Sequence, residues 1–126
     1  MNYYWDNMPE GLALMIGKTF INVTKLDAEL LFEAEDGMKF TFYHTQDCCE
    51  NVYIEDVNGD LSDLIGAPMV MAEESTNNDR ELLEGREYES FTWTFYKFAT
   101  NKGSVTVRWL GESNGYYSER VDLEVN

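Results

Sequence analysis

Apolar and polar residues alternate along most of the chain with a period of about two, the pattern of β-strands that bury one face. The clearest run is residues 90–98, where aromatic side chains alternate with threonine. The same pattern predicts strands at residues 19–24, 28–34, 39–44, 51–57, 105–110 and 118–125. A short apolar run at residues 69–72 adds one more candidate strand.

Glycine-containing dipeptides separate several of these segments and predict tight turns. They are Asp36-Gly37, Asn58-Gly59 and Asn114-Gly115. Residues 60–65 predict a single helical turn that begins at an Asp60 cap and is stopped by Gly66. The last three strands follow one another through short connections and predict an antiparallel meander. The expected fold class is mainly β: a single compact domain, residues 1–126, of about seven or eight largely antiparallel strands with one short helical turn.

Two stretches do not follow the strand pattern. Residues 1–16 contain a short apolar patch, residues 12–16, between two glycines, and we interpret them as an N-terminal extension. Residues 73–89 are polar and charged without a clear period. They predict a long exposed acidic loop, and loops of that length are often functional.

The composition and net charge of the chain exclude several classes of protein. Its 126 residues include 24 Asp and Glu against 9 Lys and Arg, a formal net charge of −15. Hydrophobic residues make up 44% and aromatic residues 14%, which excludes a disordered acidic tail. Nucleic acids and membrane surfaces both require a basic face, so we expect neither as a direct partner. With no basic leader and no long apolar stretch, we expect a cytoplasmic location.

The negative charge is concentrated in residues 47–89, where 13 acidic residues are opposed only by Arg80 and Arg86. Spread over a third of the surface, that charge would reach about one per 210 Å², within a factor of about two of DNA phosphates. Such a patch would attract a basic groove, although acidic surfaces also serve solubility alone. The candidate partner-binding residues lie in the predicted loop: Glu73, Glu74, Asp79, Glu81, Glu84, Glu87 and Glu89.

The densest group of reactive side chains is His44, Asp47, Cys48, Cys49 and Glu50. These residue types could hold a metal ion or supply a thiol nucleophile with a histidine base. Adjacent cysteines in an extended segment point to opposite faces, however, and structural zinc sites space them further apart. We therefore expect two reduced thiols, one packed in the core and one half-exposed, and no cofactor.

Two other patterns have structural explanations. Residues 56–60 place oxygens as an EF-hand loop does, but Leu61 stands where that loop requires glycine. An acidic turn followed by a capped helical turn explains them better. The aromatic stripe of Phe91, Trp93 and Phe95 could stack nucleic-acid bases. A nucleic-acid-binding protein would also need basic residues, and because this chain is strongly acidic, we expect the stripe to be part of the core.

Four stretches carry specific motifs. They are QDCCENVYIEDVNGDLSDLIG at residues 46–66, MAEES at 71–75, FTWTFYKFAT at 91–100 and SNGYYSE at 113–119. Over about residues 16–123 the chain resembles a family of small phage and prophage proteins of unknown function. The resemblance implies a phage-type origin and a compact single domain, and it supplies no activity or catalytic residue. Residues 1–15 are longer and more apolar than a minimal member requires.

These observations together predict an interaction protein. We expect a small acidic phage-type protein that binds and blocks a basic surface of host machinery, such as a nucleic-acid-binding defence complex, in the bacterial cytoplasm. Homodimerisation through an edge strand stays open. The alternative is a metal-dependent or thiol enzyme centred on residues 44–50. A sponge for a nucleotide messenger would need a basic pocket, formed from Lys97, Lys102, Arg108 and Arg120.

Overall fold

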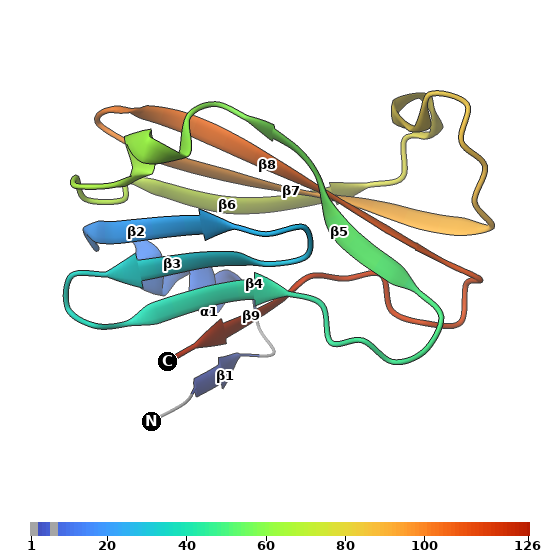
Figure 1. The fold of residues 1–126 in the computed structure, drawn as a ribbon, viewed down its shortest axis with the longest axis horizontal. Helices are drawn as coiled ribbons and strands as arrows, with labels where there is room; N and C mark the ends of the chain where they lie inside the picture. Colours follow the sequence, from blue (N-terminus) through green and yellow to red (C-terminus); the bar gives the residue numbers. More distant parts are fainter. Residues whose placement is uncertain (1–2, 6–7) are drawn as a thin grey trace.

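Two antiparallel β-sheets pack face to face in the computed structural model, which describes residues 3–5 and 8–126 (Figure 1). The first sheet has the strand order β1-β9-β4-β3-β2. Its strands are β1 (Tyr3–Trp5), β2 (Phe20–Lys25), β3 (Leu30–Ala34), β4 (Lys39–Tyr43) and β9 (Asp122–Val125). The second sheet has the order β5-β8-β7-β6. Its strands are β5 (Asn51–Asn58), β6 (Met71–Asn77), β7 (Ser90–Thr100) and β8 (Gly103–Ser113).

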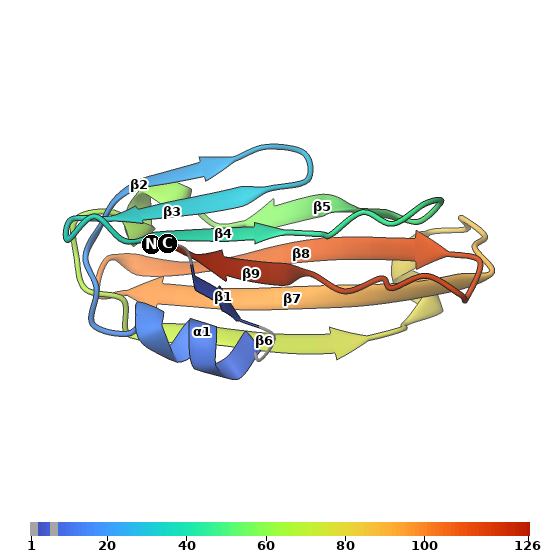
Figure 2. The ribbon, with the colours of Figure 1, turned by 90° about the horizontal axis from the view of Figure 1, so that it is seen from below.

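Three short helical elements connect or flank the strands: α1 (Met8–Met15) and the 3-10 turns η1 (Leu61–Leu64) and η2 (Arg80–Leu83). The predicted helical turn is η1, and Asp60 caps it by accepting from the backbone N–H of Ser62. Helix α1 lies beside β6 and β9, as Figure 2 shows from below. Leu12 and Met15 lie one turn apart on α1 and both are buried in the core.

Residues 8–15 were expected to belong to an extension, and they instead contribute a helix to the core. Sequence patterns missed this helix because it is short and contains Gly11, which lowers helix propensity. Residues 1–2 and 6–7 of the predicted extension lie outside the described residues.

Aromatic side chains fill the space between the two sheets. Phe32 and Phe42 of the first sheet contact Phe98 of the second at ring-centroid distances of 4.9 and 5.6 Å. Phe42 also contacts Tyr96, at 4.8 Å. Their tilted and edge-on arrangements are the favourable geometries for aromatic pairs. This cluster is the main core, and it holds the two sheets together.

Strand β7 contributes apolar residues to both of its faces. Tyr96 and Phe98 point into the main core, whereas Phe91 and Trp93 pack on the outer face with Leu83 of η2. The expectation that the aromatic stripe is core is confirmed for Phe91 and Trp93, which are 7% and 0% exposed, and Phe95 is partly buried. The stripe belongs to a second, smaller cluster, which fixes η2 to the sheet.

The predicted meander of the last three strands is wrong. Strands β7 and β8 pair with each other, but β9 belongs to the other sheet, where it pairs with β4 and β1. Between β8 and β9 the chain crosses the inner face of β8 at Gly111. A side chain there would collide with the backbone of Glu119, and its Cβ would lie 2.9 Å from the Cβ of Glu119. The missing side chain of Gly111 therefore leaves room for the chain to change sheets.

The predicted loop at residues 73–89 is also wrong in part. Residues 73–77 belong to β6, which pairs with β7 along its whole length. Because β6 is an edge strand, most of its residues are exposed and polar, so no alternating apolar pattern marks it. Residues 78–89 do connect the strands, and they contain η2.

The fold class is otherwise as predicted: a mainly β, single compact domain of two antiparallel sheets. Within the described part of the chain, no helix is long and apolar enough to cross a membrane.

Candidate functional site

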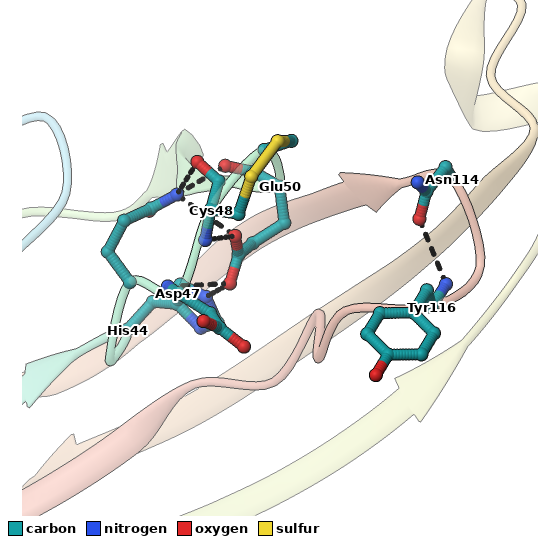
Figure 3. The surroundings of a disulfide bond; sticks show 8 residues. His44, Asp47, Cys48, Glu50, Asn114 and Tyr116 are labelled. Carbon is teal, nitrogen blue, oxygen red and sulfur yellow. Dashed lines mark hydrogen bonds and ion pairs between the residues drawn. A yellow bond between two sulfur atoms is a disulfide. The ribbon is translucent and has the colours of Figure 1, made fainter.

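The connection between β4 and β5 is organised around the carboxylate of Glu50. Its two oxygens accept from the backbone N–H groups of Cys48 at 2.9 Å and Asp47 at 3.1 Å (Figure 3). They also accept from Nε2 of Gln46 at 3.1 Å and from Nε2 of His44 at 2.8 Å. The carboxylate thus holds its own loop in place, which explains why an acidic side chain can be buried here.

The ring of His44 connects Glu50 to the segment before β9. Its Nδ1 lies 2.7 Å from the carbonyl oxygen of Arg120, and its Nε2 lies 2.8 Å from the carboxylate of Glu50. Each ring nitrogen therefore faces an oxygen that accepts hydrogen bonds. The hydrogen bond from His44, together with those from backbone N–H groups, lowers the pKa of Glu50 to about 2 against the effect of burial.

The same loop is tied to the segment that precedes β9. The backbone N–H of Thr45 donates to Oδ2 of Asp122 at 3.0 Å, and Oδ1 of Asp122 pairs with Arg120 at 3.0 Å. Asp122 is buried. Together with the contact of His44 to Arg120, these bonds join residues 44–50 to the crossing segment.

The two cysteines form a disulfide with each other. Both are exposed, so the expectation of one thiol packed in the core is wrong. The reason is the fold of the loop: Glu50 takes the buried position and leaves residues 45–49 on the surface. Disulfide-bonded sulfurs offer no thiolate, which is the species that attacks a substrate or ligates zinc.

The structure therefore unites part of the predicted reactive group. His44 and Glu50 form an ion pair with the backbone of Asp47 and Cys48 around it, while both sulfurs are joined on the outside. Among residues 3–5 and 8–126, no group of three or more His, Cys, Asp or Glu side chains could hold a metal ion. In the EF-hand-like sequence at residues 56–60, the side chain of Asp60 accepts from Ser62 and caps η1.

The seven candidate acidic residues are all exposed. Glu73 and Glu74 are neighbours on β6 and therefore point to opposite faces of the sheet. The other five lie on or beside η2, and we call them the acidic end: Asp79, Glu81, Glu84, Glu87 and Glu89.

The two arginines of this region do not neutralise the acidic end. The guanidinium of Arg80 lies over the ring of Phe91, 5.1 Å from its centroid. Arg86 donates to the carbonyl oxygen of Leu83 at 2.8 Å and lies 3.8 Å from a carboxylate oxygen of Glu55. The ion pairs found in the described part of the chain use other carboxylates: Asp36, Glu50, Glu55 and Asp122.

Packing holds the acidic end against the sheet. Leu83 is 1% exposed within the outer cluster. The indole Nε1 of Trp93 donates to the carbonyl oxygen of Asp79 at 2.9 Å, and the side chain of Asp79 caps η2. The acidic end is thus an anchored surface with a fixed shape.

A cleft of about 480 Å³ lies on the inner face of the second sheet and was missed by sequence reasoning. Figure 1 shows β7 and β8 running past the end of β4, and the segment between β8 and β9 returns along this uncovered part. The only sequence signal is in the inward residues of β7, which change from aromatic at Tyr96 and Phe98 to hydroxyl-bearing at Ser90, Thr92 and Thr94. Polar and aromatic residues dominate its lining, among them Glu74, Thr92, Thr94, Tyr117, Glu119, Arg120 and Asp122.

Comparison with known proteins gives a family but no activity. A family described as Domain of unknown function (DUF7448) matches residues 13–123. The chain belongs to the DUF7448 family. The match spans nearly the same residues as the expected resemblance to a family without known function. No curated protein and no solved structure matches the chain.

Proposed function

We propose that this DUF7448 protein is a binding protein that recognises a basic surface of a protein partner through its acidic end. The observation that carries this proposal is that the five carboxylates are exposed while Arg80 and Arg86 are turned toward Phe91 and Glu55. Unpaired carboxylates on an anchored surface would attract a basic partner and would speed its association. Glu73, the other exposed candidate of the outer face, lies on β6 opposite Lys97 and is not counted in the acidic end.

The narrower form of the proposal concerns the partner. Sequence motifs resemble those of phage and prophage proteins, and a surface of several unpaired carboxylates suits a basic groove that normally holds nucleic acid. We therefore propose a phage-type inhibitor that blocks a nucleic-acid-binding host complex, such as a defence nuclease, in the bacterial cytoplasm. We favour this function over an enzyme centred on residues 44–50, since both sulfurs there form a disulfide and both ring nitrogens of His44 have hydrogen-bond partners.

The test uses two charge variants with the same net charge. One is the triple substitution Glu81→Gln, Glu84→Gln and Glu87→Gln on the acidic end. Its matched control is Asp27→Asn, Glu29→Gln and Glu35→Gln, which are exposed acidic residues around β3. Each protein is immobilised and incubated with lysate of a bacterial host at low and high salt, and bound proteins are identified by mass spectrometry.

We expect the wild type and the control to retain a nucleic-acid-binding protein at low salt and to release it as the salt rises. The triple variant of the acidic end should retain at most about a tenth as much. Equal retention by the two variants, or capture that does not depend on salt, would contradict the proposal.

A further inference from the structure

The cleft beside β7 differs in chemistry from the acidic end. Among the described residues, its lining includes the carboxylates of Glu74, Glu119 and Asp122 and the guanidinium of Arg120. Of these three carboxylates, the one paired with that guanidinium is Asp122. Glu119 accepts from the hydroxyls of Thr92 and Ser113, and Glu74 accepts from the hydroxyl of Tyr96 at 2.6 Å. Neither of these two glutamates has a cationic partner among the ion pairs of the described residues, so acidic groups outnumber basic ones in the cleft.

One lining residue, itself almost fully buried, has a hydroxyl with no hydrogen-bond partner in the described part of the chain. Thr94 is 2% exposed, lines the cleft, and its hydroxyl makes none of the hydrogen bonds found among the described residues. The hydroxyl of Thr92 donates to the carboxylate of Glu119 at 2.7 Å, so the Thr92 oxygen can only accept a hydrogen bond from a ligand. The hydroxyl oxygens of the inner wall can therefore still accept hydrogen bonds, and they favour a ligand that brings several N–H or O–H donors.

Size and shape favour an organic ligand over a metal ion. A volume of about 480 Å³ is in the range of small-molecule sites. Tyr117 contributes an aromatic ring to the wall, and it lies edge-on to Tyr116 with centroids 5.0 Å apart. Aromatic rings attract ammonium groups, and carboxylates do so more strongly.

We propose that this cleft binds an aliphatic polyamine, with its ammonium groups at Glu74 and Glu119 and its carbon chain along Tyr117. A neutral sugar would satisfy the hydroxyls but would leave both carboxylates without a counter-charge. A phosphate-bearing ligand would be repelled by them. This site is separate from the acidic end and does not depend on a protein partner.

The neighbouring residues Glu73 and Glu74 provide a matched pair of variants. Glu74→Gln removes charge from the cleft and keeps an oxygen that can accept from Tyr96, while Glu73→Gln removes the same charge on the opposite face. Spermidine is titrated into the ¹⁵N-labelled full chain, and amide shifts are followed by NMR. Mg²⁺ at matched ionic strength and the neutral disaccharide trehalose are titrated in parallel.

We expect saturable shifts confined to β6, β7 and residues 115–123. Glu74→Gln should weaken spermidine binding about tenfold, and Glu73→Gln should change it about twofold or less. Thr94→Val, which keeps the shape of the side chain, should weaken it about fivefold.

Several outcomes would overturn the polyamine site. Equal weakening by the two glutamine variants, or shifts reproduced by Mg²⁺, would show a diffuse counter-ion cloud. Binding of trehalose without spermidine would give the ligand class as sugar, and no saturable shift at all would remove the site. Since the titration contains no protein partner, none of these results changes the outcome expected for the acidic end.

Discussion

Nε2 of His44 lies 2.8 Å from Oε2 of Glu50, and the two side chains are 3% and 0% exposed. A buried ion pair is a strong constraint because removal of one partner leaves the other charged and unpaired. In this protein the pair also holds backbone N–H groups of its loop, so its loss would affect more than one bond.

Glu50→Gln should destabilise the protein at neutral pH. The amide has one accepting oxygen in place of two, and its N–H₂ group would face N–H groups that now donate to Glu50. Chemical denaturation would measure the loss. Glu35→Gln, an exposed carboxylate, is the control and should stay within about 0.5 kcal/mol of wild type. A loss no larger than that of the control would contradict the structural role of Glu50.

The Glu50 carboxylate also predicts an acid dependence of stability. Its pKa is lowered from 4.5 to about 2 in the folded protein. As the pH falls below 4.5, the unfolded chain therefore binds a proton at this residue before the folded chain does. The contribution of Glu50 is present above pH 4.5 and is lost as the pH falls toward about 2. The stability difference between wild type and Glu50→Gln should shrink across this window, when the free energy of unfolding is measured at each pH. A constant difference would mean that the charge of Glu50 does not stabilise the fold.

The disulfide should matter less than the ion pair beside it. Cys48 and Cys49 are adjacent and exposed, so their bond restrains little of the unfolded chain. The double substitution Cys48→Ala and Cys49→Ala should cost about 1 kcal/mol, on the chain-entropy scale. Denaturation of wild type with and without a dithiol reductant should show a similar small change. A loss greater than that of Glu50→Gln would show that the disulfide organises the loop.

Sequence patterns were most reliable where one face of a strand is buried. The segments around Phe32, Phe42 and Val107 alternate clearly, and the structure contains strands there. The predicted strand at residues 69–72 overlaps only the start of β6, and residues 73–77 were not predicted because pairing with β7 stabilises them without a buried apolar face. Helix α1 escaped notice because tertiary packing of Leu12 and Met15, rather than helix propensity, keeps it in place.

The candidate site was predictable by residue type and not by arrangement. The sequence shows that His44 and Glu50 are close along the chain, but their contact depends on Arg120, which lies 76 residues further on. The cleft could not be predicted for the same reason, because residues that are far apart in the chain line it. Its carboxylates come from β6, from the segment between β8 and β9, and from the first residue of β9, and the crossing of that segment at Gly111 brings them together.

Gly111→Ala should therefore disturb the cleft and the fold together. An added Cβ would meet the backbone of Glu119, which cannot move aside as a flexible side chain could. Overpacking of this kind costs about 1–3 kcal/mol. Ser104→Ala, at an exposed position of the same strand, should stay within about 0.5 kcal/mol. Amide shifts at Thr92 should change in the first variant only, because Thr92 bonds to Glu119. Unchanged stability with unchanged Thr92 shifts would show that residue 111 does not set the path of the crossing segment.

Leu83→Ala should release the acidic end without unfolding the main core. Leu83 is 1% exposed and belongs to the outer cluster with Trp93 and Phe91, which the main core does not share. Substitutions of buried leucine by alanine cost about 2–5 kcal/mol, and here the loss should fall first on η2. Hydrogen exchange should speed up at residues 79–89 while β3 and β4 stay protected. Because the proposed surface depends on its anchored shape, this variant should also retain less of the basic partner than wild type, although it keeps every charge. Uniform exchange across both sheets would mean that the outer cluster and the main core unfold as one unit.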